Sequence, residues 1–168
     1  MGRENQNHTN ATKVILVEIE RKFLLDAIPF DLSKFEHIDI EQAYISVDPV
    51  IRLRRADDDF FLTVKQGFDM AHEEAEFVIT QEQYDRLLRK AETKSIKKTR
   101  VRIPIVEGHI AELDIYHDSL AGFATVEVEF KNVENAREFM PPVWFGQEVT
   151  GDLRYANSAI ATFGLQIH

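Results

Sequence analysis

Polar and apolar residues alternate along several segments of the chain, beginning with VEIERKFLL at residues 17–25. Successive side chains of a β-strand point to opposite faces, so this period of two predicts a strand. One face of the strand carries Glu18, Glu20 and Lys22, whereas the other face carries the apolar residues Val17, Ile19 and Phe23. The segment therefore predicts a strand with one charged face and one core face.

The same alternation returns in VIRLRRA, FFLTVKQG, EEAEFVIT, KKTRVRIPIV, AELDIYH and TVEVEFK. The acids on the charged faces are Glu18, Glu20, Glu74, Glu76, Glu112, Asp114, Glu127 and Glu129. The bases are Lys22, Arg52, Arg54, Lys65, Lys98, Arg100, Arg102 and Lys131. Like charges recur two residues apart, so the signs are largely sorted by strand. The alternative is an open antiparallel sheet with one wet face, but such a face does not require this sorting.

The sorting favours a closed barrel whose charged faces line the lumen. Roughly eight strands leave room inside for a small ligand or for packed side chains. Helices and loops must then cover the apolar outer faces. Two segments have helical spacing: residues 80–93, with a capping box of Thr80 and Gln83, and residues 151–164, which end at Gly164. The predicted fold class is α+β: an eight-stranded antiparallel β-barrel, or tunnel, with flanking helices.

Length and composition limit the classes of protein to which the chain can belong. We expect a disordered polar leader at residues 1–13, followed by a single tunnel domain at residues 14–168. No apolar run is long enough to predict a membrane span. The absence of cysteine excludes zinc–thiolate sites and cysteine catalysis, and is typical of a cytoplasmic protein. A net charge of −9 argues against a general nucleic-acid binder, so we expect a small-molecule partner.

A lumen with both signs of charge suits a polyphosphate and a divalent cation. Arginine and lysine bind phosphate oxygens, and clustered carboxylates repel one another unless a cation lies among them. Phosphoryl transfer depends mainly on positioning and charge neutralisation, which these residues supply. One alternative is a noncatalytic polyphosphate-binding module, which needs no carboxylate cluster. The other is a barrel stabilised by internal salt bridges, although buried ion pairs seldom repay their desolvation.

EIERK at residues 18–22 resembles the E-x-E-x-K signature of the CYTH superfamily, the triphosphate tunnel metalloenzymes. The resemblance continues in order through RLRR, LTVKQG, EEAEF, KKTRVRI, AELDIY, VEVEF and EVTGDLRYANSAIA, and covers about residues 15–165. The length and the VTGDLRY ending are most similar to the short bacterial members, several of which act as inorganic triphosphatases. The resemblance implies an eight-stranded antiparallel tunnel with opposed acidic and basic walls.

The resemblance also implies roles for single residues. Triphosphate would be bound by Lys22, Arg52, Arg54, Lys65, Lys98 and Arg100. The divalent metal, Mg²⁺ or Mn²⁺, would be bound by Glu18, Glu20, Glu127 and Glu129. The acidic wall would be completed by Glu74, Glu76 and Asp114. The pattern continues in Arg102 and Lys131, at the tunnel mouth or in salt bridges. The sequence departs from the family pattern at His72 and Glu73, which stand where the family often has a basic residue. This departure weakens the expected binding of the far phosphate of the substrate.

Two residues are candidates for direct catalysis. Lys98 is expected to stabilise the bond being broken, because it lies on a separate strand from Arg52 and Arg54. Tyr44 is a candidate to polarise a water, and the alternative is that it packs with its hydroxyl hydrogen-bonded.

The expected reaction is metal-dependent hydrolysis of the terminal phosphoanhydride of inorganic triphosphate. The alternatives on the same site are a thiamine-triphosphatase, a nucleoside- or RNA-5′-triphosphatase, and a class IV adenylyl cyclase. Each of these needs an apolar or stacking pocket for an organic group at a tunnel mouth. The aromatic residues that could supply one are Phe60, Phe61 and Tyr116.

Overall fold

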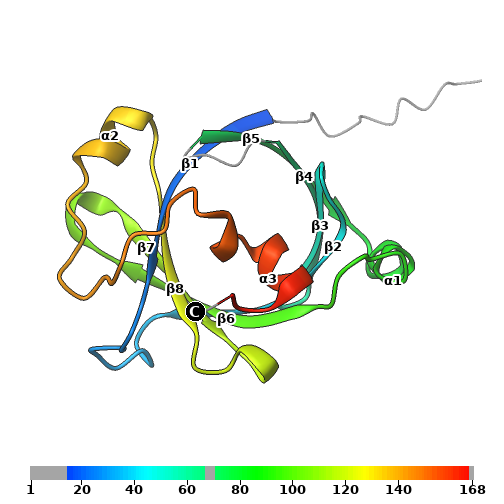
Figure 1. The fold of residues 1–168 in the computed structure, drawn as a ribbon, viewed down its shortest axis with the longest axis horizontal. Helices are drawn as coiled ribbons and strands as arrows, with labels where there is room; N and C mark the ends of the chain where they lie inside the picture. The colour runs from blue at the N-terminus through cyan, green and yellow to red at the C-terminus, as the bar shows by residue number, and fades with distance from the viewer. Residues whose placement is uncertain (1–14, 67–70, 167–168) are drawn as a thin grey trace, which may run out of the picture.

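Eight antiparallel strands close into a barrel in the computed structural model, which describes residues 15–66 and 71–166 (Figure 1). The strands are β1 (Ile15–Leu24), β2 (Glu36–Val47), β3 (Val50–Ala56), β4 (Asp59–Gln66), β5 (Ala71–Ile79), β6 (Ile96–Pro104), β7 (Ile110–Tyr116) and β8 (Ala124–Glu129). Around the barrel they follow the order β1-β5-β4-β3-β2-β6-β7-β8. The predicted eight-stranded barrel is confirmed. The predicted leader at residues 1–13 lies outside the described residues.

This strand order gathers the charges into two walls. The acids of β7, β8, β1 and β5 lie on four neighbouring strands, and Lys22 is the basic exception among them. The bases of β4, β3 and β6 lie on the remaining strands, together with the neutral Gln42 and Tyr44 of β2. The walls meet at two seams, between β5 and β4 and between β6 and β7. The chain therefore sorts charge by strand, and the topology assembles those strands into opposed walls.

The main hydrophobic core lies outside the lumen. It is formed by the apolar faces of β1, β6, β7 and β8, and Phe23, Leu113 and Val126 are almost completely buried in it. Helix α2 (Val133–Glu138) and the loops that carry Phe30 and Trp144 cover this face. The barrel is thus inverted, with an apolar shell around a charged interior, as the alternation predicted.

The predicted helix at residues 80–93 is present but shorter. Helix α1 (Gln81–Leu88) begins at the predicted capping box, in which Thr80 and Gln83 exchange side-chain and backbone hydrogen bonds. Its one buried side chain, Tyr84, packs on Phe60 with ring centroids 5.1 Å apart, and so covers the outer face of β4. No helix in the described ranges, 15–66 and 71–166, is long and apolar enough to cross a membrane.

The C-terminal segment closes one end of the barrel. The short helix η3 (Leu153–Tyr155) and helix α3 (Asn157–Phe163) lie across the lumen in the axial view of Figure 1. Ile160 packs against Tyr44 and Tyr116 in a second hydrophobic cluster at this end. Gly164, with φ of 73°, ends α3 as predicted. Two short 3₁₀ helices, η1 (Val106–Gly108) and η2 (Asp118–Leu120), lie in the connections on either side of β7.

The lumen opens at the other end. Along β6, the side-chain exposure rises from 2% at Lys98 to 13% at Arg100 and 39% at Arg102. Because these residues point into the lumen in turn, solvent access increases steadily away from α3. The barrel is therefore a tunnel that the C-terminal segment closes at one end.

The stretch before α3 is pinned against β1. Strand β1 pairs with β5 only through residue 19 and with β8 from residue 20 onward. Its free edge is covered by residues 147–149, through Leu24 N–H donating to the Gln147 carbonyl and Val149 N–H donating to the Lys22 carbonyl, both at 2.8 Å. At Gly146 the two backbones approach so closely that a Cβ atom would lie 2.6 Å from the Leu24 carbonyl oxygen.

We expect Gly146→Ala to lower the thermal stability of the protein. The added methyl group overlaps a backbone atom that cannot rotate away, and overpacking of this kind costs about 1–3 kcal/mol. Thermal unfolding followed by circular dichroism measures the effect. The matched control is Gln147→Ala, which removes an exposed side chain next to the same contact and should leave the melting temperature unchanged. Equal melting temperatures for both variants would show that the two backbones do not approach so closely.

Candidate active site

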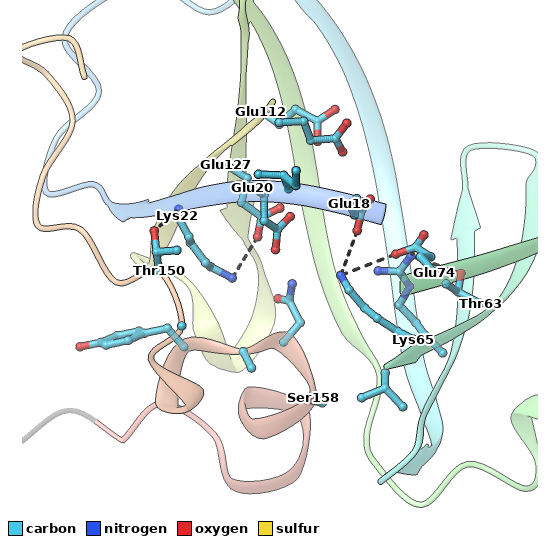
Figure 2. Close-up of a pocket in the computed structure, with 18 of the residues that line it drawn as sticks. Glu18, Glu20, Lys22, Thr63, Lys65, Glu74, Glu112, Glu127, Thr150 and Ser158 are labelled. Carbon is cyan, nitrogen blue, oxygen red and sulfur yellow. Dashed lines mark hydrogen bonds and ion pairs between the residues drawn. The ribbon is translucent and has the colours of Figure 1, made fainter. Parts of the chain in front are cut away.

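The lumen contains a cavity of about 740 Å³ that is lined by side chains from all eight strands (Figure 2). This volume lies within the range of about 300–1,000 Å³ that is common for small-molecule sites. All the predicted site residues line it except Asp114, which is fully buried behind Lys98 and Arg100. The structure therefore brings residues from distant parts of the chain to one cavity.

At the seam between β5 and β4, the ion pairs are loose. Lys65 Nζ lies 3.2 Å from Glu18 and 3.6 Å from Glu74. Figure 2 marks both contacts with dashed lines. Arg52 lies 3.7 Å from Glu74 and 3.6 Å from Glu76. At most of these separations the charges attract one another without forming well-directed hydrogen bonds.

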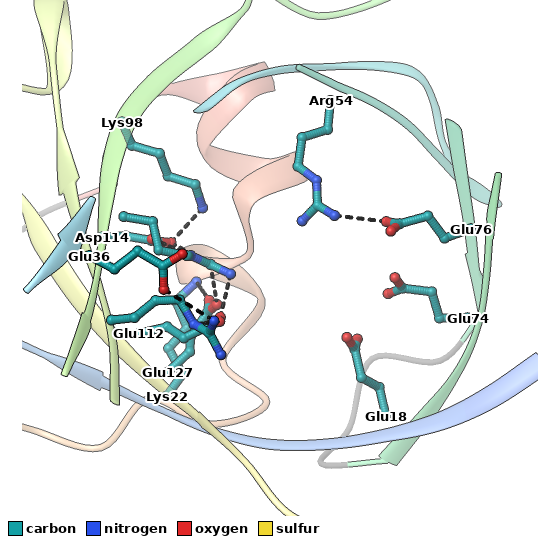
Figure 3. Close-up of polar contacts among 12 residues, drawn as sticks. Glu18, Lys22, Glu36, Arg54, Glu74, Glu76, Lys98, Glu112, Asp114 and Glu127 are labelled. Atoms are coloured by element: carbon teal, nitrogen blue, oxygen red, sulfur yellow. Dashed lines mark hydrogen bonds and ion pairs between the residues drawn. The ribbon is translucent and has the colours of Figure 1, made fainter. Parts of the chain in front are cut away.

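Several buried polar atoms at this seam have no hydrogen-bond partner among the described residues. They are the Nε atoms of Arg52 and Arg54 and the Oε2 atom of Glu74. Arg54 does use its Nη2 atom, which donates to Glu76 at 2.9 Å (Figure 3). A buried polar group without a partner costs about 1–3 kcal/mol. The basic wall is thus only partly satisfied by protein groups, and it can accept an oxyanion ligand.

The seam between β6 and β7 is tightly paired, on the opposite side of the lumen in Figure 3. Arg100 donates to both carboxylate oxygens of Asp114, at 2.7 and 2.8 Å, and to Glu127 at 3.0 Å. It also donates to Glu112. Burial opposes the charge on Asp114, but Arg100 and Lys98 outweigh it and lower the pKa of that carboxyl. Asp114 is therefore an ionised anchor for the two cations in front of it.

Lys98 lies against this anchor at the closed end of the lumen. Its Nζ atom is 2.5 Å from Asp114 Oδ2. Burial lowers the pKa of Lys98 to about 8, although Asp114 favours the charged form. Its ammonium also lies 5.6 Å from the centre of the Tyr116 ring. Lys98 is thus a largely desolvated cation at the cavity wall.

The four predicted metal ligands are not equivalent. Glu127 lies 3.0 Å from Lys22 Nζ and also accepts from Arg100. Burial disfavours its charge, but these cations hold the pKa of Glu127 well below its usual value. In contrast, Glu20 and Glu129 face each other across β1 and β8 and have no ion-pair partner within the described part of the chain. The acidic wall therefore contains a pair of uncompensated carboxylates.

The surroundings of this pair disfavour its negative charge. Burial, followed by the charge of Glu127, raises the pKa of Glu20. Burial and the neighbouring carboxylates Glu18 and Glu112 raise the pKa of Glu129 from 4.5 to about 7. A divalent cation bound by carboxylate oxygens relieves such repulsion, so the donor set fits Mg²⁺ or Mn²⁺. Across residues 15–66 and 71–166, no three acidic or imidazole side chains are already arranged to hold a metal ion.

Removal of the Glu129 charge should stabilise the metal-free protein at alkaline pH. Because the pKa of Glu129 is raised on folding, the folded state binds its proton more tightly, and stability is lost as pH rises from 4.5 through 7. In EDTA, we expect Glu129→Gln to melt at a higher temperature than the wild type at pH 8, with no difference at pH 4.

The control for this comparison is Glu138→Gln, which changes an exposed glutamate of α2. This variant should melt at the wild-type temperature at both pH 8 and pH 4. If Glu129→Gln melts at or below the wild-type temperature at pH 8, Glu129 is not destabilised by its neighbours.

Tyr44 lies at the cavity wall near the closed end and is almost completely buried. Gln42 Nε2 donates to its hydroxyl oxygen at 2.9 Å. Burial raises the pKa of Tyr44, which keeps the hydroxyl neutral. Both interpretations of Tyr44 agree with this placement, because the hydroxyl is hydrogen-bonded and also borders the cavity.

The three aromatic candidates for an organic pocket do not come together. Phe60 packs outside the barrel on Tyr84. Phe61 lies beside Arg54, whose guanidinium carbon is 5.2 Å from the ring centre. Tyr116 is 1% exposed and lies beside Lys98. The described residues thus offer no stacking pocket built from these three rings.

Sequence reasoning missed several neutral residues of the cavity. Gln42 has the same strand parity as Tyr44, so the period of two could have identified it. Thr150, Asn157 and Ser158 come from the C-terminal segment, where no strand pattern indicates which side chains face the lumen. Arg102 pairs with Glu36 at 3.3 Å, as the salt-bridge alternative predicted. Glu73 is exposed, and the side chain of His72 lies outside the described residues.

The chain is similar to known proteins along most of its length. No family model matches it. It is 35% identical over 149 residues to an inorganic triphosphatase from Nitrosomonas europaea, and the match covers 87% of this chain and 97% of that protein. An inorganic triphosphatase from Acetivibrio thermocellus is 33% identical over 145 residues, which is 84% of this chain and 90% of that protein.

Solved structures give the same assignment. A crystal structure of an inorganic triphosphatase is 35% identical and has a TM-score of 0.64, covering 87% of this chain and 95% of the other. A putative adenylyl cyclase from Hippeastrum with a dominant triphosphatase activity is 18% identical, with a TM-score of 0.55 over 71% of this chain and 82% of the other, and shows the fold alone. With its charged eight-stranded tunnel and two relatives above 30% identity, the chain belongs to the inorganic triphosphatases of the CYTH superfamily, the triphosphate tunnel metalloenzymes.

Proposed function

We propose that the chain is a metal-dependent inorganic triphosphatase, which hydrolyses the terminal phosphoanhydride of triphosphate. The observation that carries the proposal is one closed-ended cavity between a basic wall and an acidic wall. Among the described residues, the basic wall has buried donors without hydrogen-bond partners, and the acidic wall has two carboxylates, Glu20 and Glu129, without an ion-pair partner. The names of the two relatives support the same reaction.

The loosely paired bases are the primary contacts for the substrate. Arg52 and Lys65 face the cavity and lie 3.2–3.7 Å from their carboxylate partners, distances that a phosphate oxygen can improve upon. Arg54 donates to Glu76 at 2.9 Å, but its Nε atom has no hydrogen-bond partner among the described residues. Arginine donates two parallel hydrogen bonds to a phosphate, whereas lysine acts as a compact charge. Lys22 and Arg100 already neutralise Glu127, so they would bind substrate while remaining in that network.

The metal would be held by Glu18, Glu20, Glu127 and Glu129. When bound, Mg²⁺ or Mn²⁺ supplies neutralisation of the phosphoryl oxygens and can activate a water. The raised pKa of Glu20 and of Glu129 reflects an excess of negative charge, which a cation offsets. Glu74 and Glu76 complete the acidic wall beside the substrate.

Two groups at the closed end act on the reacting bond. The ammonium of Lys98 would stabilise the negative charge that develops on the leaving diphosphate. The hydroxyl of Tyr44 accepts from Gln42, so its proton is available for a water or a phosphate oxygen. Phe60, Phe61 and Tyr116 do not come together into a stacking pocket, which favours inorganic triphosphate over the thiamine, nucleotide and cyclase alternatives. The retained carboxylates disfavour a noncatalytic polyphosphate-binding module.

Phosphate release from inorganic triphosphate tests the proposal. With Mg²⁺ or Mn²⁺ we expect orthophosphate and diphosphate in equal amounts, and with excess EDTA we expect neither product. Full activity in EDTA would rule out the metal-dependent reaction. No release with either metal would rule out the triphosphatase function.

A further inference from the structure

The C-terminal segment contacts the catalytic lysine indirectly. Asn157, the first residue of α3, accepts a hydrogen bond from the Tyr116 hydroxyl at 2.6 Å. The ring of Tyr116 in turn lies 5.6 Å from Lys98 Nζ. We propose that Asn157 is a positioning residue for Lys98, acting through the ring of Tyr116. The proposal rests on the proposed function, in which Lys98 stabilises the leaving group.

Lys98 needs more than one contact to be held in place. Its side chain has four rotatable carbon–carbon bonds, so a single ion pair leaves the ammonium mobile. That ion pair is with Asp114, whose two oxygens are also occupied by Arg100. The Tyr116 ring provides a second contact, because the negative face of an aromatic ring attracts a cation. The position of Lys98 therefore depends on the position of this ring.

The hydrogen bond from Asn157 holds the ring. Tyr116 is 1% exposed, so its hydroxyl cannot turn to bulk water if the acceptor is lost. Without this hydrogen bond the outer end of the ring is no longer tethered and can rotate, and the hydroxyl left unpaired in Asn157→Ala also gains by turning toward another acceptor, such as Thr125. Such a rotation moves the ring away from Lys98. Loss of the Asn157 side chain would thus change the geometry of an ammonium that it does not touch.

Asn157 is itself rigidly placed. In the same helix, Ile160 and Ala161 pack into the hydrophobic cluster at the closed end of the barrel. Before the helix, Asp152 caps η3 by accepting from the Arg154 backbone N–H. The segment further upstream is pinned to β1, as described above. A fixed acceptor is what a positioning role requires.

Steady-state kinetics on three variants test the proposal. We expect Asn157→Ala and Tyr116→Phe each to lower kcat for triphosphate by about tenfold with little change in KM, because the Lys98 contact strengthens as charge develops. The double variant should be no slower than either single variant, because both substitutions remove the same hydrogen bond, the one between Tyr116 and Asn157. In a Lys98→Met background, Asn157→Ala should have no further effect. A purely structural role would still lower kcat in that background.

The matched control is Thr162→Ala on the same helix. This exposed hydroxyl donates to the Ser158 carbonyl at 2.7 Å, so the variant loses a hydrogen bond of α3 that has no route to Lys98. Its kcat should equal that of the wild type. If Thr162→Ala lowers kcat as much as Asn157→Ala, helix stability explains the loss and the proposal is wrong. The same conclusion follows if Asn157→Ala and Tyr116→Phe leave kcat unchanged.

A second readout does not depend on activity. The side-chain carbon–proton resonances of Lys98, assigned with the Lys98→Met variant, sense the ring current of Tyr116. We expect Asn157→Ala to shift these resonances and Thr162→Ala to leave them in place. Unchanged resonances in Asn157→Ala would overturn the positioning role. If the wild type fails to hydrolyse triphosphate, the proposed function fails, while these spectra still test how Lys98 is held.

Discussion

Glu20→Gln should lower kcat/KM for inorganic triphosphate by about 100-fold or more while the protein remains folded, because the lost charge is one of the two uncompensated carboxylates that we assign to the metal. Glu20 has no ion-pair partner within the described part of the chain, so the substitution orphans no cation. Burial and Glu127 raise its pKa, so removal of the charge relieves repulsion. The melting temperature in EDTA at pH 8 should therefore not decrease.

The control for this variant is Glu73→Gln. Glu73 lies on β5 next to Glu74 but on the outer, exposed face of the barrel. Its kcat/KM should match that of the wild type at saturating Mg²⁺ or Mn²⁺. Wild-type activity in Glu20→Gln, at the same metal concentration, would remove Glu20 from the metal site.

The second large effect is expected at Lys98. Lys98→Met should lower kcat by about 100-fold with little change in KM, which is the typical loss when one group that stabilises a developing anion is removed. Arg100 keeps its two hydrogen bonds to Asp114, so the buried carboxylate remains paired and the barrel should still fold. Single-turnover hydrolysis of triphosphate measures the chemical step directly.

Lys97→Met provides the comparison on the neighbouring residue. Lys97 points outward, and its pair with Asp118 at 3.5 Å is exposed to solvent, so the change should leave kcat unaltered. A Lys98→Met variant that raises KM but keeps kcat would place Lys98 in ground-state binding only. The leaving-group role would then be wrong.

The barrel could be predicted from the sequence because its two faces differ so sharply. Residues such as Glu18 and Glu20 alternate with apolar ones, and a slip of one residue would bury the charges in the outer shell. The acidic and basic walls could not be predicted from the local alternation of residues alone. Acids at residues 18 and 127 share a wall because β1 pairs with β8, a contact between opposite ends of the chain. The family resemblance implied this arrangement, and alternation alone did not.

Other features left little trace in the sequence. Helix α2 has six residues, which is too short for a helical period to stand out, although Asn132 caps its first turn. The ion pairs across the seams depend on register, which places Asp114 beside Arg100 and not beside another base. The contact of Asn157 with Tyr116 joins a helix to a strand 41 residues away. No periodic pattern indicates a pair of this kind.

The most direct test of the account is a comparison of kcat/KM for inorganic triphosphate, ATP, GTP, thiamine triphosphate and long-chain polyphosphate, each with Mg²⁺ and Mn²⁺. The charged lumen offers contacts for three phosphates, and the candidate aromatic residues form no pocket for an organic group. We predict that triphosphate is cleaved at least about tenfold faster than ATP, a preference of about 1.4 kcal/mol. Faster cleavage of ATP, or cyclic AMP as its product, would contradict the account.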